Sequence, residues 1–290
     1  MRLRTLPLSL AGVILGVALA ADNVKVSPWT ALLIFLTTVC LQILSNLSNE
    51  LGDTLSGTDS ADRQGPQYAL GSGELTMGDI KRLIGVFIVL CVLCGLAMIR
   101  VSFGSIFKTE SLCLEALGAA AIVGAMRYTL GKNPYGYRGL GDVSVFIFFG
   151  LVSVLGSYYV AARELPPPPM LLPASAIGCF SVGVLNINNI RDMKTDAVNR
   201  VTVAIRLGMS GARIYQTVLI VLGWVLLLTF CAVYDFAPGH LMSVITLPLY
   251  IKHLHGAWTL SERALDPMLP ILVISTFLLS ILTGAGFLIF

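Results

Sequence analysis

The stretch from Trp29 to Asp62, WTALLIFLTTVCLQILSNLSNELGDTLSGTDSAD, begins as an apolar run and ends in amides and acids. Residues 29–47 are mostly apolar, and a helix needs roughly 20 such residues to cross the hydrocarbon core of a bilayer. The remainder of the stretch gathers asparagine, glutamate and aspartate side chains. A membrane helix that ends in so many oxygen ligands needs a chemical reason for them.

The whole chain has the composition of a membrane protein. Of its 290 residues, 56% are hydrophobic and 12% are charged, whereas about a quarter of the residues in a soluble domain are charged. Alternating segments typical of a membrane β-barrel are absent. The sequence predicts an all-α membrane protein, one domain over residues 1–290, with nine transmembrane helices and polar loops that cap the active site. The nine apolar segments are about 6–21, 29–47, 83–99, 113–128, 143–162, 170–187, 215–234, 239–251 and 268–290.

The distribution of basic residues predicts the orientation. If the N-terminus lies in the cytoplasm, 15 of the 19 Lys and Arg residues fall in cytoplasmic loops, as the positive-inside rule requires. We therefore expect a bacterial inner-membrane protein with a cytoplasmic N-terminus and active site, and with its C-terminus outside. Residues 1–21 also imitate a signal peptide, but we expect a retained first helix. His253 and His255 are expected to be solvated in a cytoplasmic loop.

Two clusters of polar residues follow apolar segments. Asn46, Asn49, Glu50 and Asp53 have the spacing of one helical face, with Asp59 farther along the chain. Asn188, Asp192 and Asp196 are also spaced for one face, with Asn189 beside them. The two motif loops, about 46–82 and 186–213, are four segments apart, which suggests a repeated four-helix unit.

The acids in these clusters are costly to place on a helix. Like charges four residues apart destabilise a helix, and carboxylates at its C-terminus oppose its dipole. Bound Mg²⁺ resolves both conflicts, because it takes oxygen ligands and commonly binds one or two carboxylates plus substrate phosphates. Two Mg²⁺ ions bridged by a diphosphate would balance the charge. The alternative is that these acids only face water. That alternative would be sufficient for a single cluster, but two such clusters on the same side of the membrane favour a functional site.

At these residues the chain resembles the UbiA superfamily of intramembrane prenyltransferases. The signatures are NELGDTLSGTD (Asn49–Asp59) and DMKTD (Asp192–Asp196). Glu50 stands where the family usually has aspartate, and Gly57 stands where the wider superfamily has its third acid. The resemblance therefore leaves the roles of Glu50 and Asp59 open.

Finer features resemble the branch of the family that prenylates 1,4-dihydroxy-2-naphthoate in menaquinone synthesis. They are DRQGP (Asp62–Pro66), NPYGYRGLGDVSVFIFFG (Asn133–Gly150) and NNIRDMKTDAVNRVTVAIRLG (Asn188–Gly208). The resemblance implies Mg²⁺-dependent transfer of a polyprenyl chain from its diphosphate to that acceptor, with loss of CO₂, inside a lipid bilayer and without nucleic acid. Another acceptor, such as 4-hydroxybenzoate or homogentisate, is the alternative. An ion-coupled transporter is more remote, since its acids would lie near the membrane midplane.

The resemblance and the clusters together assign candidate roles to individual residues. The candidate metal ligands are Asn49, Glu50, Asp53, Asp59, Asn188, Asn189, Asp192 and Asp196. The candidate catalytic residues are Asp53, Asp192, Asp196, Tyr137 and Asp142. The candidates for diphosphate binding are Arg63, Asn46, Asn49, Lys132, Arg138 and Arg206.

Some of these roles have structural alternatives. Lys132 and Arg138 either bind the diphosphate or only set the orientation of the protein in the membrane, and the sequence favours neither alternative. Asp142 either accepts a proton from the acceptor or caps the fifth helix. Arg191, between the residues of the second cluster, is interpreted as facing lipid head groups.

Overall fold

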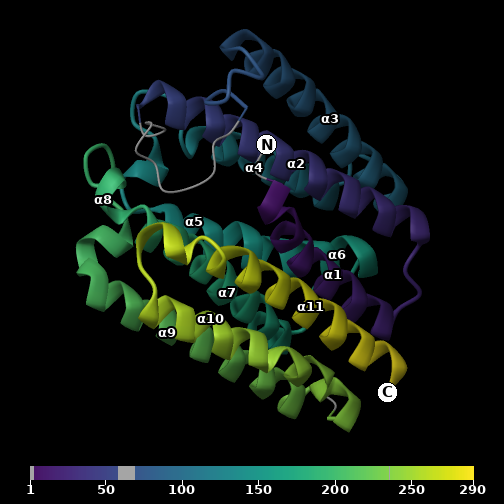
Figure 1. The fold of residues 1–290 in the computed structure, drawn as a ribbon. Coiled ribbons are helices and arrows are strands. Elements are labelled where there is room, and N and C mark those ends of the chain that lie inside the picture. The colour runs from purple at the N-terminus through teal and green to yellow at the C-terminus, as the bar shows by residue number, and fades with distance from the viewer. Residues whose placement is uncertain (1–2, 58–68, 235) are drawn as a thin grey trace.

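The computed structural model describes residues 3–57, 69–234 and 236–290, which form the helical bundle of Figure 1. The α-helices are α1 (Leu6–Asn23), α2 (Pro28–Leu55), α3 (Met77–Phe103), α4 (Thr109–Arg127), α5 (Gly141–Val145), α6 (Ser157–Ala162), α7 (Leu171–Arg191), α8 (Met193–Asp196), α9 (Val203–Val233), α10 (Leu247–Thr259) and α11 (Met268–Ile289). The π-helix η3 (Phe146–Gly156) joins α5 to α6. Short 3₁₀ turns are η1 (Leu3–Thr5), η2 (Tyr135–Tyr137), η4 (Pro168–Met170), η5 (Pro238–Thr246) and η6 (Glu262–Leu265). The all-helical fold class is confirmed.

Eight helical segments of the described chain are long and apolar enough to cross a membrane. The predicted eighth segment, 239–251, is not one of them, so the count of nine spans is not confirmed. There the chain forms the 3₁₀ turn η5 and then α10, which has only 13 residues. Pro248 lies in the first turn of α10, where proline is favoured because its missing N–H is not needed. Together η5 and α10 pack along α11.

Helix α2 is longer than its apolar segment. The segment ends near residue 47, but the helix continues to Leu55 and has 28 residues. At 1.5 Å per residue it is roughly 42 Å long, whereas the hydrocarbon core of a bilayer is about 30 Å thick. The residues of the first polar cluster therefore belong to the end of a spanning helix rather than to a loop.

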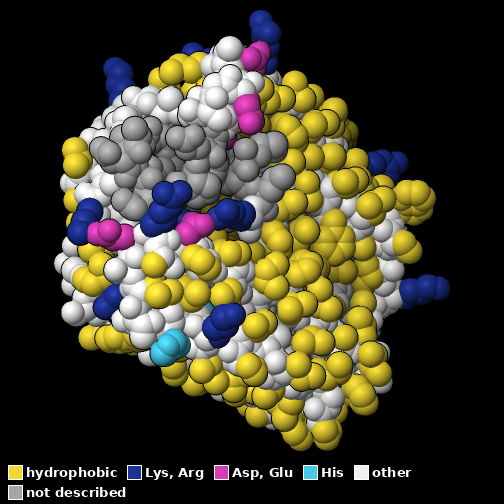
Figure 2. All heavy atoms as spheres, in the orientation of Figure 1, with side chains coloured by type: hydrophobic (Ala, Val, Ile, Leu, Met, Phe, Trp, Pro, Cys, Tyr) yellow, Lys and Arg dark blue, Asp and Glu magenta, His cyan; other side chains and the backbone are white. Residues whose placement is uncertain are grey.

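Two hydrophobic clusters organise the bundle. The larger joins α1, η3, α6, α7, α9 and α11, and the smaller joins α2 and α3 with side chains from α4. Helix α7 is the most buried of the eight candidate spans. Figure 2 shows an apolar surface over the middle of one face, whereas charged side chains gather toward the end where α8 lies.

A chain of buried polar side chains joins α7, α9 and α10. The Asn186 amide donates to Gln216 Oε1 at 2.8 Å, and Gln216 Nε2 lies 2.9 Å from His253 Nε2. The other ring nitrogen of His253 lies 2.9 Å from the carbonyl oxygen of Met268. All three side chains are fully buried. The expectation of a solvated His253 was therefore wrong, because α10 packs this side chain against neighbouring helices.

The contact between η3 and α7 depends on a glycine pair. A Cβ atom added at Gly150 would lie 2.6 Å from the Cα atom of Gly178 and 2.7 Å from the carbonyl oxygen of Ala174. Both are backbone atoms and cannot rotate away. We expect Gly150→Ala to cost about 1–3 kcal/mol of unfolding free energy, as overpacking generally does, and to lower the melting temperature in detergent.

Gly156→Ala is the matched control for this substitution. It lies on the same π-helix, and its added Cβ would have its nearest contact at 3.8 Å, with Val152. The control should keep the melting temperature or raise it slightly, because alanine loses less backbone entropy than glycine in a helix. Equal melting temperatures for the two variants would contradict the close contact.

Candidate active site

The first polar motif lies on the last turns of α2. Asn46, Asn49 and Asp53 all line one cavity, which confirms that they share a face. The Tyr137 hydroxyl donates to Asp53 Oδ1 at 2.8 Å. The Gln42 amide donates to Asn46 Oδ1 at 3.2 Å. These bonds fix the oxygen atoms of the motif at the cavity wall.

Glu50 is oriented differently from its neighbours in the motif. Its carboxylate accepts a hydrogen bond from the backbone N–H of Leu70 at 2.9 Å, and its side chain is buried. Among the described residues, those lining the cavity include Asn49 but not Glu50. Asp59 and Arg63 lie outside the described residues.

The second motif is interrupted by a turn. Helix α7 ends at Arg191, Asp192 has φ −94° and ψ 9°, and α8 is a single turn that ends at Asp196. The Thr195 hydroxyl donates to the Asp192 carbonyl at 2.9 Å, and such local side-chain bonds compete with regular helix. The helix through Asn188, Asp192 and Asp196 is therefore interrupted at Asp192, although the N–H groups of Asp192 and Asp196 still donate to the carbonyl oxygens four residues earlier, at 3.1 and 2.9 Å. Their shared face stays a prediction.

Arg191 connects the second motif to the N-terminus and to the chain before α11. Its guanidinium binds both carboxylate oxygens of Asp192, at 2.9 and 2.6 Å, and donates to Asn188 Oδ1 at 2.9 Å. A third nitrogen donates to Asp266 at 2.7 Å, and Asp266 also pairs with Arg4 at 2.8 Å. Arg191 is 4% exposed and lines the cavity. Its interpretation as a lipid-facing residue was wrong, because three acceptors surround it inside the bundle.

Arg200 brings the two motifs together. Its guanidinium lies 2.5 Å from Asp196 Oδ1 and 4.0 Å from Asp53 Oδ1. Its central carbon lies 5.7 Å from the ring centroid of Tyr137. Arg200 also lines the cavity. A single, largely enclosed cation therefore faces one acid from each motif.

The charges around Arg200 affect one another strongly. Burial raises the pKa of the Asp196 carboxyl above its ordinary value, although Arg200 opposes this shift. Burial alone would lower the pKa of Arg200, but Asp196 and Asp53 raise it above its ordinary value. Arg200 therefore remains a cation. Within the described part of the chain, Asp196 Oδ2 is buried without a hydrogen-bond partner, which leaves an acceptor oxygen for a cation or donor.

Tyr137 connects the 133–140 loop to both motifs. Its hydroxyl contacts Asp53 and also lies 3.0 Å from the Ser56 hydroxyl. Its carbonyl oxygen accepts a hydrogen bond from the N–H of Val201 at 2.9 Å, next to Arg200. The structure therefore places Tyr137 beside the polar groups, as predicted, although its catalytic role stays a prediction.

Asp142 lies inside the bundle on the first turn of α5. It lines the cavity, is 7% exposed, and accepts a hydrogen bond from the Tyr215 hydroxyl at 3.0 Å. The N-cap residue of α5 is Leu140 and not Asp142. The capping alternative for Asp142 was therefore wrong, and the residue lines the cavity instead.

Three predicted diphosphate-binding residues lie apart from the cavity. Lys132, Arg138 and Arg206 are exposed, and Arg206 donates to the carbonyl oxygen of Arg138 at 3.3 Å. The described basic side chains that line the cavity are Arg4, Arg191 and Arg200. Sequence analysis missed Arg200, although its position four residues after Asp196 is the spacing of a helical ion pair.

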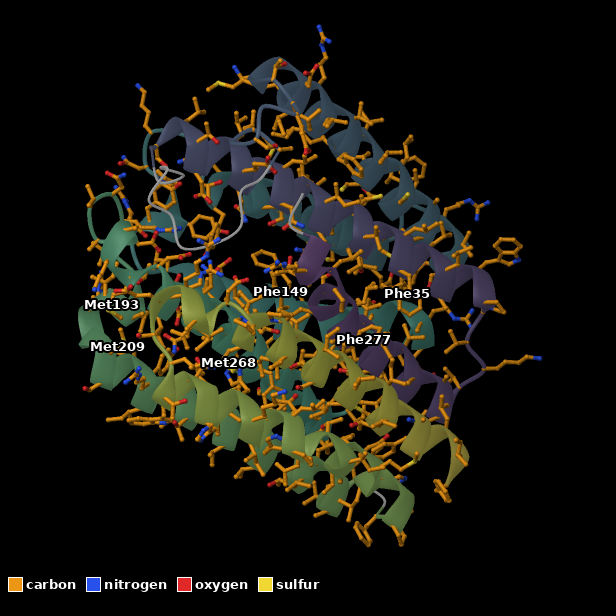
Figure 3. The ribbon with its side chains drawn as sticks, viewed as in Figure 1. Phe35, Phe149, Met193, Met209, Met268 and Phe277 are labelled. Carbon is orange, nitrogen blue, oxygen red and sulfur yellow. The ribbon has the colours of Figure 1, made fainter. Side chains whose placement is uncertain are left out.

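The cavity lies between the two hydrophobic clusters and has a volume of about 590 Å³. On α2 its lining extends from Ile34 to Asp53, which corresponds to roughly 28 Å at the helical rise per residue. Its polar end is lined by Asn46, Asn49 and Asp53 of the first motif and by Asn188 and Asn189 of the second, whereas Asp192 and Asp196 are not among the described lining residues. Its other end is lined by apolar side chains such as Met98 and Leu117. Figure 3 shows the lining residue Phe149 near the middle of the bundle, away from Met193 of α8.

The polar end has the donor set that Mg²⁺ requires. Hard oxygen ligands on the cavity wall are the amides of Asn49 and Asn188 and the carboxylate of Asp53. The carboxylates of Asp192 and Asp196 lie behind the lining residues Arg191 and Arg200, to which they bind, and Asp196 Oδ2 has no hydrogen-bond partner among the described residues. The described residues contain no group of three or more His, Cys, Asp or Glu that could hold a metal ion by itself. Mg²⁺ commonly takes only one or two carboxylates and completes its shell with water and substrate phosphates. The site therefore fits Mg²⁺ that arrives with a diphosphate.

Comparison with known proteins identifies related chains over the whole length. Residues 9–286 match the UbiA prenyltransferase family. A 1,4-dihydroxy-2-naphthoate octaprenyltransferase of Haemophilus influenzae is 34% identical, over 99% of this chain and 94% of its own. The enzyme of the same name from Escherichia coli is 42% identical, over 76% of this chain and 71% of its own.

A solved structure shares the fold at low sequence identity. A UbiA homologue from Archaeoglobus fulgidus, bound to DMAPP and Mg²⁺, has a TM-score of 0.67 and 14% identity, with 99% of each chain covered. At this identity the likeness concerns the arrangement of helices. It agrees with the membrane bundle described above.

Proposed function

We propose, because the chain belongs to the UbiA prenyltransferase family, that it transfers a polyprenyl group from its diphosphate to 1,4-dihydroxy-2-naphthoate with loss of CO₂, giving demethylmenaquinol, the reduced form of demethylmenaquinone. The observation that carries this proposal is the cavity, whose charged end suits a diphosphate and whose long apolar end suits a prenyl chain. The names of the relatives from H. influenzae and E. coli support the choice of acceptor.

The two motifs would hold two Mg²⁺ ions around the diphosphate. The proposed ligands are Asn49 and Asp53 from the first motif, and Asn188, Asn189, Asp192 and Asp196 from the second. When bound, Mg²⁺ supplies positive charge that stabilises the leaving diphosphate. The Mg²⁺ in the A. fulgidus homologue supports the use of this metal.

The protein side chains act on charge, orientation and water. Arg200 donates to the diphosphate oxygens and offsets the negative charge that develops as the bond to the allylic carbon breaks. Tyr137 orients Asp53 through its hydrogen bond. Asp142 lines the cavity and accepts a proton from a hydroxyl group of the acceptor, whose attacked ring carbon loses CO₂. The apolar walls exclude water, which would otherwise capture the allylic cation.

The membrane orientation stays part of this proposal. The abundance of Lys and Arg in alternate loops favours a cytoplasmic N-terminus and active site and the bacterial inner membrane. A C-terminus outside also requires η5 and α10 to cross the membrane together as a ninth span, in addition to the eight candidate spans. The repeated four-helix unit also stays a prediction from the two motifs.

The function is tested with purified protein in lipid nanodiscs. The assay contains Mg²⁺, a prenyl diphosphate, and either 1,4-dihydroxy-2-naphthoate, 4-hydroxybenzoate or homogentisate. We expect mass spectrometry to find the prenylated, decarboxylated naphthalene product, one CO₂ released per product, and no product in excess chelator. Turnover of 4-hydroxybenzoate without turnover of the naphthoate would contradict the acceptor and favour the alternative.

A further inference from the structure

Glu50 belongs to the first motif but contacts a different part of the chain. Asn49 and Asp53, on either side of it in sequence, line the cavity. Glu50 is 1% exposed, and its Oε1 atom accepts a hydrogen bond from the N–H of Leu70 at 2.9 Å. The Glu50 carboxylate, which the motif predicts to be a metal ligand, therefore accepts a hydrogen bond from a backbone amide.

That amide belongs to a compact turn, residues 69–75, which we call the return segment. The N–H of Gly73 donates to the Leu70 carbonyl at 3.2 Å, and the N–H of Leu75 donates to the Ala69 carbonyl at 3.1 Å. Leu70 and Leu75 pack against the hydrophobic cluster of α2 and α3. The return segment is therefore ordered by its own hydrogen bonds and by an apolar base.

The return segment also forms part of the cavity wall. Ala69, Ser72 and Glu74 line the cavity beside the first motif. The chain leaves α2 after Leu55 and comes back to the same helix at Glu50. The position of this wall relative to the motif thus depends on the contact between Glu50 and Leu70.

We propose that Glu50 is a positioning residue that fixes the return segment against the first motif, and that it is not a metal ligand. This inference rests on the proposed function, since it concerns the wall of the proposed diphosphate site. Glutamate has one more methylene group than aspartate, and the extra length lets its carboxylate reach the Leu70 amide. The replacement of the family's aspartate by glutamate is therefore explained by the partner that the side chain contacts.

Two substitutions at Glu50 separate a positioning role from a metal ligand. Glu50→Gln keeps the length and an acceptor oxygen but removes the charge. Glu50→Asp keeps the charge but shortens the side chain. A positioning residue needs length, so Gln should keep kcat/KM within about threefold and Asp should lose about tenfold, the equivalent of one hydrogen bond. Neither should change the Mg²⁺ concentration that gives the half-maximal rate.

If Glu50 is a metal ligand, the activities of the two variants should have the opposite order. Glu50→Asp would then keep its activity, as in family members with aspartate there, and Glu50→Gln would need more Mg²⁺. That order, or a raised Mg²⁺ requirement for Glu50→Gln, would overturn the proposal. Asp53→Asn, which alters a proposed ligand on the same helix, is the reference for a raised Mg²⁺ requirement.

Hydrogen–deuterium exchange tests the contact without substrate or metal. In Glu50→Asp the Leu70 amide should exchange about 10- to 100-fold faster, since hydrogen bonds to charged groups contribute more than neutral ones. In Glu50→Gln the increase should be no more than about fivefold, and in Asp53→Asn exchange should be unchanged. Unchanged exchange in Glu50→Asp would overturn the proposal.

These measurements distinguish two failures. Inactivity of the wild-type protein with every prenyl diphosphate and acceptor would contradict the proposed function, whereas the exchange experiment would still decide whether Glu50 holds the return segment. An active wild type with unchanged Leu70 exchange in Glu50→Asp would contradict the positioning role alone.

Discussion

Replacing Asp192 with asparagine is expected to lower the turnover number by about 10²- to 10³-fold, the usual effect of losing one charge contact in a transition state. Asparagine keeps the size of the side chain but removes one negative charge from the proposed Mg²⁺ site. Extra Mg²⁺ should restore part of the activity, because weaker metal binding is part of the defect. The measurement is turnover against Mg²⁺ concentration for the wild type and the variant.

The structure supplies a matched control at Asp266. Asp192 and Asp266 both pair with the guanidinium of Arg191, and only Asp192 belongs to the second motif. Asp266→Asn should therefore have a smaller effect on turnover and should leave the Mg²⁺ requirement unchanged. Each variant also costs about 1.5–3 kcal/mol of stability, since Arg191 loses one charged hydrogen-bond partner, so turnover is compared at equal folded fractions. Equal Mg²⁺ requirements for the two variants would contradict the metal-binding role.

Replacing Arg200 with glutamine should also lower turnover by about 10²- to 10³-fold. Arg200 lies between Asp53 and Asp196, its side chain is only 11% exposed, and it lines the cavity. Its removal leaves these acids without their shared partner and removes the proposed donor to the diphosphate. Added Mg²⁺ should not restore activity, because the lost group is a hydrogen-bond donor to the substrate. The measurement is kcat and KM for the prenyl diphosphate at several Mg²⁺ concentrations.

Arg206→Gln is the control for this variant. Arg206 lies six residues farther along the chain, is exposed, and donates to the Arg138 carbonyl. Its replacement should change turnover by less than about threefold, because surface contacts of this kind contribute little. If Arg206→Gln lost activity and Arg200→Gln kept it, the sequence-based choice of Arg206 would be correct and the assignment to Arg200 would be wrong.

The sequence predicted the elements of the site better than the directions of its side chains. The helical spacing of Asn46, Asn49 and Asp53 was sufficient to place them on one face, because α2 remains regular to its end. The same spacing did not predict the interruption at Asp192, where a turn separates α7 from α8. Helical spacing predicts a shared face only as long as the helix continues. At Asp192 the local hydrogen bonds of Thr195 and Arg191 accompany the end of the regular helix.

Contacts between distant segments account for the other differences. His253 is buried because Gln216 and Met268 come from two other helices, and neither partner is apparent from the sequence around the histidine. Glu50 likewise depends on Leu70, 20 residues along the chain. A side chain's direction is set by partners that only the folded chain brings close.

The length of α2 has a consequence for the ionic conditions at the site. Even tilted by about 20°, a common value for membrane helices, a helix of this length spans roughly 39 Å, so its motif end rises out of the hydrocarbon core. An anionic membrane has a surface potential of about −30 mV. For a divalent cation this potential is equivalent to about 1.4 kcal/mol, or a tenfold higher local concentration. The Mg²⁺ available to Asn49 and Asp53 would therefore be set by the charge of the surrounding lipids as well as by the bulk solution, and the same protein would require less added Mg²⁺ in anionic bilayers than in neutral ones.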